Sequence, residues 1–153
     1  MRDIVENNPF LNDLKNTIGL NKSLIEVGSG TSQLSIAMAI GTNNLVVAMD
    51  PTIESLKLGQ KFAEKIKVSN VLFLNADIFD NPIEDNFFDC VWCSGVLHHT
   101  KDSREGFEII SKWVKPNGLI IIGVYNSIGR LRTNFRQVIY NLLGRSRFAR
   151  KLV

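Results

Sequence analysis

Three short apolar runs, each with an acidic residue at or just beyond its carboxyl end, constrain the fold of this chain more than any other feature. In chain order the runs and their acids are residues 24–27 with Glu26, residues 45–49 with Asp50, and residues 71–74 with Asp77. Helical patterns separate the runs, and strands that alternate with helices predict a parallel sheet with right-handed crossovers. The carboxyl ends of parallel strands meet at one edge of the sheet, so we expect the three acids to surround one ligand site.

The remaining patterns predict the other elements of an α/β domain. Strands are expected at residues 24–27, 45–49, 71–74, 87–93 and 119–125, and helices at residues 9–18, 32–40, 53–66 and 103–113. Asn8 is expected to cap the first helix, and a turn at residues 115–118 is expected to precede the last strand. With 153 residues and 44% hydrophobic content, the chain is expected to form one domain that spans residues 1–153.

The two cysteines favour packing over chemistry. Cys90 and Cys93 lie three positions apart in an expected strand, so their side chains point to opposite faces of the sheet. No second pair is available to complete a zinc site, and we interpret both residues as small buried apolar groups. No metal ion is predicted.

The amino-terminal residues and the apolar runs bear on location. The first residues lack the apolar stretch of a secretory signal, and Glu6 and Asp13 argue against a transit peptide. The apolar run at residues 119–122 is far too short to cross a bilayer. We therefore expect a cytoplasmic protein.

The loop after the first strand discriminates between two kinds of nucleotide ligand. Gly28 and Gly30 let the backbone turn sharply and let a ligand approach the main chain. Asp50 is placed to accept hydrogen bonds from ribose hydroxyls, a position that nicotinamide dinucleotides also use. Glu26 discriminates between the two kinds of ligand, because a carboxylate before the loop repels a pyrophosphate and favours a sulfonium or an ammonium group. Gln33 stands where a dinucleotide loop needs its third glycine, so a nicotinamide-dependent reductase is disfavoured.

Six segments in a fixed order carry a resemblance to a known family. They are residues 26–31, Asp50, residues 75–78, residues 88–94, residues 96–99 and residues 115–120. Together they resemble the class I S-adenosylmethionine-dependent methyltransferases, and the resemblance covers residues 24–126. It implies a Rossmann-like three-layer αβα sandwich with a mostly parallel sheet. It also implies an enzyme that uses S-adenosyl-L-methionine.

The same resemblance implies a cofactor site. Asp50 matches the ribose-binding acid of the family, and Asp77 with the N–H of Ile78 matches the segment that meets the adenine. The predicted cofactor-binding residues are Glu26, Gly28, Ser29, Gly30, Asp50, Pro51, Asp77, Ile78 and Ser94.

The resemblance implies a reaction as well, namely in-line displacement of the activated methyl group by a nucleophile of the acceptor. His98 and His99 lie just beyond the fourth strand and are weak candidates for a general base. The alternative interpretation is that one histidine packs or caps the loop and the other is solvated. Carbon, oxygen and nitrogen acceptors all suit this scaffold, so the sequence leaves the acceptor open.

The C-terminal part of the chain departs from the family pattern. The family fold resembles a seven-stranded sheet whose last two strands form an antiparallel hairpin, whereas residues 127–153 are expected to form a basic amphipathic helical tail. Its apolar face would consist of Phe135, Val138, Ile139, Leu142 and Leu143. We therefore expect strands one to five without the hairpin, in a chain that is either truncated or ends at a five-stranded core.

The charge of the tail leaves its role open between three interpretations. Residues 109–153 contain nine Lys and Arg residues and no acid, against all fifteen acids in residues 1–108. Packing of the apolar face on the core or on absent downstream strands is favoured over binding to a membrane surface or another anionic partner. Nucleic-acid binding is the least favoured, because aromatic residues for base stacking are few.

Two functional hypotheses follow. The first is a methyltransferase that acts on a small-molecule substrate. The second is a non-catalytic or truncated relative that binds the cofactor and acts through a partner chain. The presence of Glu26, Asp50 and Asp77 favours the first hypothesis. The oligomeric state stays open.

Overall fold

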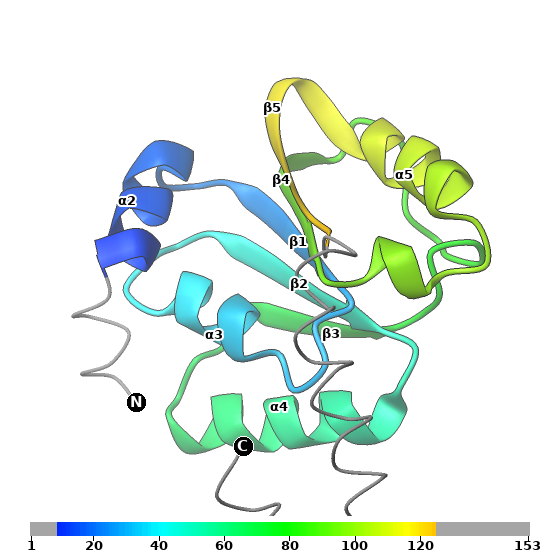
Figure 1. Cartoon of the computed structure of the whole chain (residues 1–153). Coiled ribbons are helices and arrows are strands. Elements are labelled where there is room, and N and C mark those ends of the chain that lie inside the picture. Colours follow the sequence, from blue (N-terminus) through cyan, green and yellow to red (C-terminus); the bar gives the residue numbers. More distant parts are fainter. Residues whose placement is uncertain (1–8, 125–153) are drawn as a thin grey trace, which may run out of the picture. The chain divides into compact units, whose positions relative to one another are not determined.

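The computed structural model describes residues 9–124, which contain one parallel sheet of five strands in the order β3-β2-β1-β4-β5 (Figure 1). The strands are β1 (Ser23–Val27), β2 (Leu45–Asp50), β3 (Val71–Asn75), β4 (Phe88–Ser94) and β5 (Val114–Gly123). This order places the reversal of the topology between β1 and β4, where ligands of open α/β sheets bind. The predicted α/β fold with a parallel sheet is confirmed.

The four α-helices of the described residues lie where the sequence pattern predicts them, to within one residue at each end. They are α2 (Pro9–Ile18), α3 (Gln33–Ala39), α4 (Ile53–Lys65) and α5 (Ser103–Lys112). The short 3-10 helix η1 (Leu97–His99) was not predicted. Asp102 caps α5 because its carboxylate accepts hydrogen bonds from the backbone N–H groups of Arg104 and Glu105, each 2.9 Å long. Among residues 9–124, no helix is long and apolar enough to cross a membrane.

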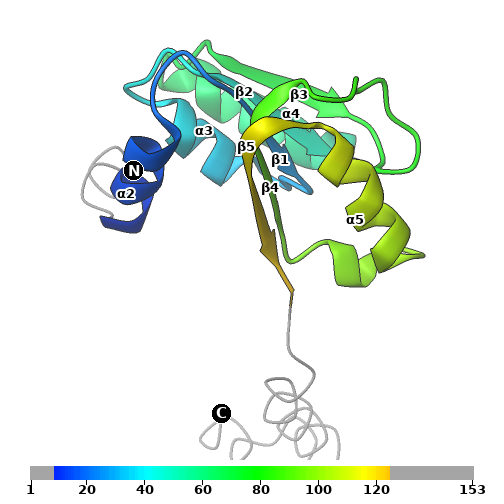
Figure 2. The same ribbon diagram turned by 90° about the horizontal axis from the view of Figure 1, so that it is seen from above.

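The helices form two layers with the sheet between them. Helices α2, α3 and α4 cover one face, and η1 and α5 cover part of the other face (Figures 1 and 2). Leu24 and Cys90 belong to the core under α3, whereas Ile25 and Cys93 belong to the core under α5. The two cysteines are therefore buried on opposite faces, as predicted, and both are free thiols. Burial raises the pKa of Cys90 to about 12 and that of Cys93 to about 11, so both stay protonated at neutral pH.

The predicted turn at residues 115–118 is wrong as a boundary, because β5 already begins at Val114. Phe88 of β4 pairs with Val114, and Cys90, two residues later, pairs with Leu119. Residues 115–118 therefore bulge out of the strand. They include Pro116, which has no N–H for the ladder, and Asn117 with φ +64°. The local turn chemistry was identified correctly, but it interrupts a strand instead of preceding one.

Several predictions lie outside the described residues. They are the Asn8 cap, the end of the last strand at Tyr125, the C-terminal hairpin and the tail at residues 127–153.

The crossover from β3 to β4, residues 76–87, forms no helix although the structure describes all of it. It leaves part of the β2–β3 face uncovered, with an apolar cavity of about 550 Å³. The cavity is lined by Val47, Leu72, Phe73, Leu74, Pro82, Ile83, Glu84, Phe87 and Phe88. The early part of the crossover lies elsewhere, at the carboxyl ends of the strands.

Asp89 joins three strands at the amino end of the sheet. Its Oδ2 accepts hydrogen bonds from Lys115 Nζ at 2.8 Å and from the N–H and the hydroxyl of Ser23 at 2.9 Å. Partial burial acts to raise the pKa of this carboxyl. The hydrogen bonds from Lys115 and Ser23 prevail and hold the pKa well below its usual range.

The variant Asp89→Asn is expected to lower the free energy of unfolding at pH 7 by about 2 kcal/mol, since charge-assisted hydrogen bonds are lost. A carboxyl with a depressed pKa stabilises the fold above its unfolded-state pKa and loses that contribution as pH falls. Denaturant unfolding at pH 7 and at about pH 2 to 3 should therefore show the difference shrinking with acid. Asp85→Asn, at an exposed position, is the control. A difference that is constant with pH would contradict this account.

Candidate functional site

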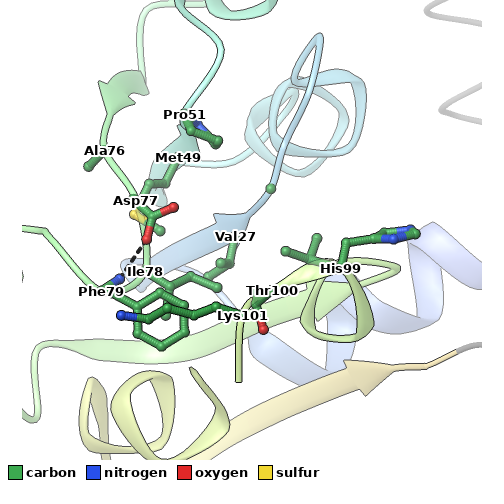
Figure 3. Close-up of a pocket in the computed structure, with 12 residues that line it drawn as sticks. Val27, Met49, Pro51, Ala76, Asp77, Ile78, Phe79, His99, Thr100 and Lys101 are labelled. Carbon is green, nitrogen blue, oxygen red and sulfur yellow. Dashed lines mark hydrogen bonds between the residues drawn. The ribbon is translucent and has the colours of Figure 1, made fainter. Parts of the chain in front are cut away.

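A cavity of about 390 Å³ opens at the carboxyl ends of the strands (Figure 3). Its described lining consists of Val27, Gly28, Met49, Pro51, Ala76, Asp77, Ile78, Phe79, Val96, His99, Thr100 and Lys101. These residues come from the ends of β1, β2, β3 and β4 and from the segments that follow them. The volume lies within the range of small-molecule and cofactor sites, and apolar residues form most of the wall.

The glycine loop is fastened to the end of β2. The N–H groups of Gly28 and Ser29 donate to the Met49 carbonyl at 2.8 and 2.9 Å. Gly28 has φ +71°, and a Cβ at this position would lie 2.3 Å from Cγ2 of Val96. The backbone thus approaches the β4 side of the cavity more closely than a side chain allows. The hydroxyl of Ser29 faces that of buried Ser32 at 3.2 Å, away from the described lining.

Asp50 holds this loop from the other side. Its Oδ2 accepts from the N–H of Gly30 and its Oδ1 accepts from the N–H of Thr52, each at 2.8 Å. The residue is 8% exposed and is not part of the lining, although its neighbour Pro51 is. An ionised carboxylate offers about four acceptor positions, so it retains capacity for a ligand beyond these two bonds.

Glu26 is not brought to the cavity. Its Oε2 accepts hydrogen bonds from the N–H and the hydroxyl of Ser35 in α3, on the face that α2 and α3 cover. Burial raises the pKa of Glu26, the Ser35 bonds oppose this effect, and the charge of Asp50 adds to the rise. In this structure the carboxylate joins β1 to the first turn of the helix that follows the glycine loop.

The variant Glu26→Gln is expected to be at least as stable as the wild type at pH 8. A raised pKa means that ionisation of Glu26 costs the folded state stability as pH rises through the folded-state pKa. A glutamine oxygen still accepts from Ser35 but carries no charge. Unfolding free energies measured at pH 5 and pH 8 should therefore fall less with pH in the variant than in the wild type. Equal pH slopes in the two proteins would show that burial does not shift this group.

Asp77 and Ile78, which the sequence predicts as cofactor-binding residues, lie in the cavity wall. The carboxylate of Asp77 accepts from the N–H of Phe79 at 2.9 Å, which shapes the turn at the end of β3 (Figure 3). Asp80, two positions further on, is not part of the described lining, so Asp77 is the better-placed acid.

The segment after β4 carries both candidate bases, His98 and His99, but brings only one of them to the cavity. The rings of His98 and His99 lie 4.0 Å apart between centroids, but only His99 belongs to the described lining.

Ser94, a predicted cofactor contact, is exposed and packs against Gly123 of β5. A Cβ added to Gly123 would lie 2.1 Å from the Ser94 hydroxyl oxygen. Ser94 is therefore at the sheet edge of the site and not in the cavity.

The sequence interpretation missed several lining residues, including Phe79, Val96, Thr100 and Lys101. Thr100 and Lys101 lie between η1 and Asp102, the N-cap of α5. The capping pattern at Asp102 was therefore the signal in the sequence that could have located Lys101. Phe79 depends on the path of the crossover, which no local pattern reveals. Among the described residues, no group of three or more His, Cys, Asp or Glu side chains is arranged to hold a metal ion.

The chain is similar to proteins of one family. A family model described as a methyltransferase domain matches residues 19–143. A ubiquinone/menaquinone biosynthesis C-methyltransferase of Blochmanniella pennsylvanica is 29% identical over 102 residues, which are 65% of this chain and 40% of that protein. The chain spans about 40 to 52% of the length of the first curated relatives it matches.

Solved structures agree on the fold. The YcgJ protein of Bacillus subtilis has a TM-score of 0.68 at 19% identity, over 84% of this chain and 56% of that one. A putative S-adenosyl-L-methionine-dependent methyltransferase of Methanococcus maripaludis has a TM-score of 0.66 at 23% identity, over 92% of this chain and 69% of that one.

Proposed function

The chain belongs to the class I S-adenosylmethionine-dependent methyltransferases, and from this premise we propose that its cavity binds S-adenosyl-L-methionine and that the domain methylates a small-molecule acceptor. One observation carries the proposal. A single cavity of about 390 Å³ joins the closely approached backbone of Gly28 to Asp77 and Ile78. A flexible chain fits over the glycine, and a nucleobase fits at the end where a carboxylate faces the cavity.

The residues present fit such a cofactor. In the proposed complex, the methionine part lies along the backbone of Gly28, whose missing Cβ lets Val96 close this side of the cavity. Asp50 is proposed to accept from ribose hydroxyls with the acceptor positions that Gly30 and Thr52 leave unused. Asp77 and the N–H of Ile78 are proposed to meet the base, since both lie at the same end of the cavity.

In the proposed mechanism the protein mainly binds and orients the reactants. When bound, the cofactor supplies a methyl group that its sulfonium already activates. Val27, Met49 and Val96 form an apolar wall that excludes water from this part of the cavity. The residues that line the cavity would hold the acceptor for direct in-line attack on this methyl group. For an O–H or N–H acceptor, the imidazole of His99 is proposed to take the proton at the mouth of the cavity.

Alanine at either histidine is expected to leave cofactor affinity nearly unchanged, because neither ring is needed for the proposed cofactor contacts. His99→Ala is expected to lower the rate constant of methyl transfer by about 10²-fold if the acceptor needs a base. His98→Ala is the matched control and should retain most of the rate. Calorimetry gives the affinity, and single-turnover kinetics gives the rate. A large loss of affinity in either variant would place that histidine against the cofactor.

The acceptor is proposed to be a small molecule, in keeping with curated relatives that are named as C-methyltransferases of ubiquinone and menaquinone biosynthesis. The substrate screen should start with aromatic diols that offer an electron-rich ring carbon. Phenols and secondary amines serve as oxygen and nitrogen comparators. Methylated product at carbon alone would assign the acceptor atom.

Calorimetric titration with S-adenosylhomocysteine, with NADH as the comparison ligand, tests the proposal. Micromolar binding of the first ligand alone is expected. A folded chain that binds neither ligand would reject the cofactor site and favour the second hypothesis, a non-catalytic or truncated relative that acts through a partner chain.

The cytoplasmic location and the role of the basic tail stay predictions. Cell fractionation tests the location, and cosedimentation with vesicles tests whether the tail binds a membrane surface.

A further inference from the structure

We propose that Lys101 and Phe79 form a clamp across the base end of the cavity, in which Lys101 donates a hydrogen bond to the nucleobase and Phe79 holds its ammonium group in place. This inference rests on the proposed function and adds two specificity-determining residues to it. Both residues line the cavity, and they come from different segments, the β3–β4 crossover and the segment between η1 and α5.

The position of the ammonium group is the first argument. Lys101 Nζ lies 4.2 Å from the centroid of the Phe79 ring, and Figure 3 shows the lysine side chain extended along that ring. A cation this close to an aromatic face is attracted by the ring quadrupole, so an otherwise flexible side chain has a preferred place. An ammonium group carries three N–H donors, so those not directed at the ring can serve a ligand in the cavity.

The ring itself is held from two sides, which is the second argument. The N–H of Phe79 donates to the Asp77 carboxylate at 2.9 Å, so the aromatic residue and the acid belong to one turn. On the α5 side, a Cβ at Gly106 would lie 3.6 Å from Cζ of Phe79, so the ring lies beside the helix at the position where the helix carries no side chain. The crossover is thereby held against α5 at the residue that supports Lys101.

The chemistry of the cavity gives the third argument. Among the described lining residues, Asp77 is the only carboxylate and Lys101 the only lysine or arginine. An acceptor and a donor therefore face one end of the same cavity. A ligand that carries an amino group beside ring nitrogens, as a 6-aminopurine does, satisfies both. The clamp thus favours a base with a donor edge and an acceptor edge.

The test compares Lys101→Met, which keeps the length of the side chain and removes its charge, with Lys112→Met in the last turn of α5. Lys101 is exposed, so the melting temperature should change by no more than about 2 °C. Calorimetry with S-adenosylhomocysteine should show a five- to twentyfold weaker affinity for Lys101→Met and an unchanged affinity for Lys112→Met. Lys101→Arg should restore the affinity to within about threefold, since arginine makes the same ring contact.

Adenosine, a fragment of the cofactor, shows which part of the ligand Lys101 contacts. Adenosine, titrated by ligand-observed NMR, should lose the same factor in Lys101→Met as S-adenosylhomocysteine loses, because the contact is with the base. Phe79→Leu should lose affinity for both ligands by a similar factor, and Lys101→Met should then add little to it. Equal affinities of wild type and Lys101→Met, or a loss confined to S-adenosylhomocysteine, would overturn the clamp. Failure of the proposed function is distinct, since the wild type itself would then not bind.

Discussion

Gly28→Ala is expected to weaken S-adenosylhomocysteine binding by more than about thirtyfold and to lower the free energy of unfolding by about 1–3 kcal/mol. Two separate costs combine at this position. The backbone has φ +71°, which a residue with a Cβ adopts at a penalty, and the new Cβ would lie 2.3 Å from Cγ2 of Val96. Relief requires either the loop or Val96 to move, and both line the cavity.

Gly30→Ala separates the cost of the positive φ from the cost of the steric clash. Gly30 also has a positive φ, +52°, but a Cβ there would meet no atom within 4 Å. Its variant should therefore show the conformational cost without the clash, and lose less affinity than Gly28→Ala. The double variant Gly28→Ala with Val96→Ala should recover part of the binding, which calorimetry and denaturant unfolding measure as a coupling energy. Equal losses at the two glycines and no recovery would exclude the close approach as the cause.

Asp50→Ala is expected to weaken cofactor affinity at least tenfold and to destabilise the fold. The change removes the acceptor of the Gly30 and Thr52 N–H groups and with it the proposed partner of the ribose. A hydrogen bond to a carboxylate contributes about 1.5–3 kcal/mol. Calorimetry below the onset of unfolding gives the affinity, and hydrogen exchange at the Gly30 amide reports whether the loop has been released.

Asp85→Ala, at an exposed position of the crossover, is the control for loss of one negative charge. It should change neither the affinity nor the Gly30 exchange rate. Unchanged binding in Asp50→Ala would remove this carboxylate from the cofactor site. Faster exchange at Gly30 without a loss of affinity would assign it to the loop alone.

The strands and helices were predictable because local patterns determine them. Runs such as residues 45–49 are short and apolar on both faces, as is typical of a central strand of a parallel sheet, and the helices alternate with them. The turn at residues 115–118 misled because Pro116 and Asn117 break the local pattern in the same way at a loop and at a bulge. Only the pairing of Phe88 with Val114 shows which of the two it is.

The candidate site was predictable in position but not in side-chain direction. A residue at a strand end can be placed at the carboxyl edge from sequence, and Asp77 and Ile78 do line the cavity. The direction in which Glu26 points depends on the hydrogen bonds that Ser35 offers, nine positions away in the next helix. Phe79 and Lys101 meet only because the crossover passes beside α5, a tertiary contact that no short pattern encodes.

The crossover without a helix also bears on how such a domain can change over evolution. Its first residues, Asp77 to Phe79, line the cavity at the carboxyl ends of the strands, whereas Pro82, Ile83 and Glu84 border the separate apolar cavity over β2 and β3. Lengthening a loop costs only about 0.6 kcal/mol per doubling, so the later residues can accept an inserted segment at small expense. An insertion after Asn81 would gain a ready apolar surface to fold on while the cofactor contacts kept their places. Diversity among sequences with this sheet should therefore concentrate in the second half of the crossover.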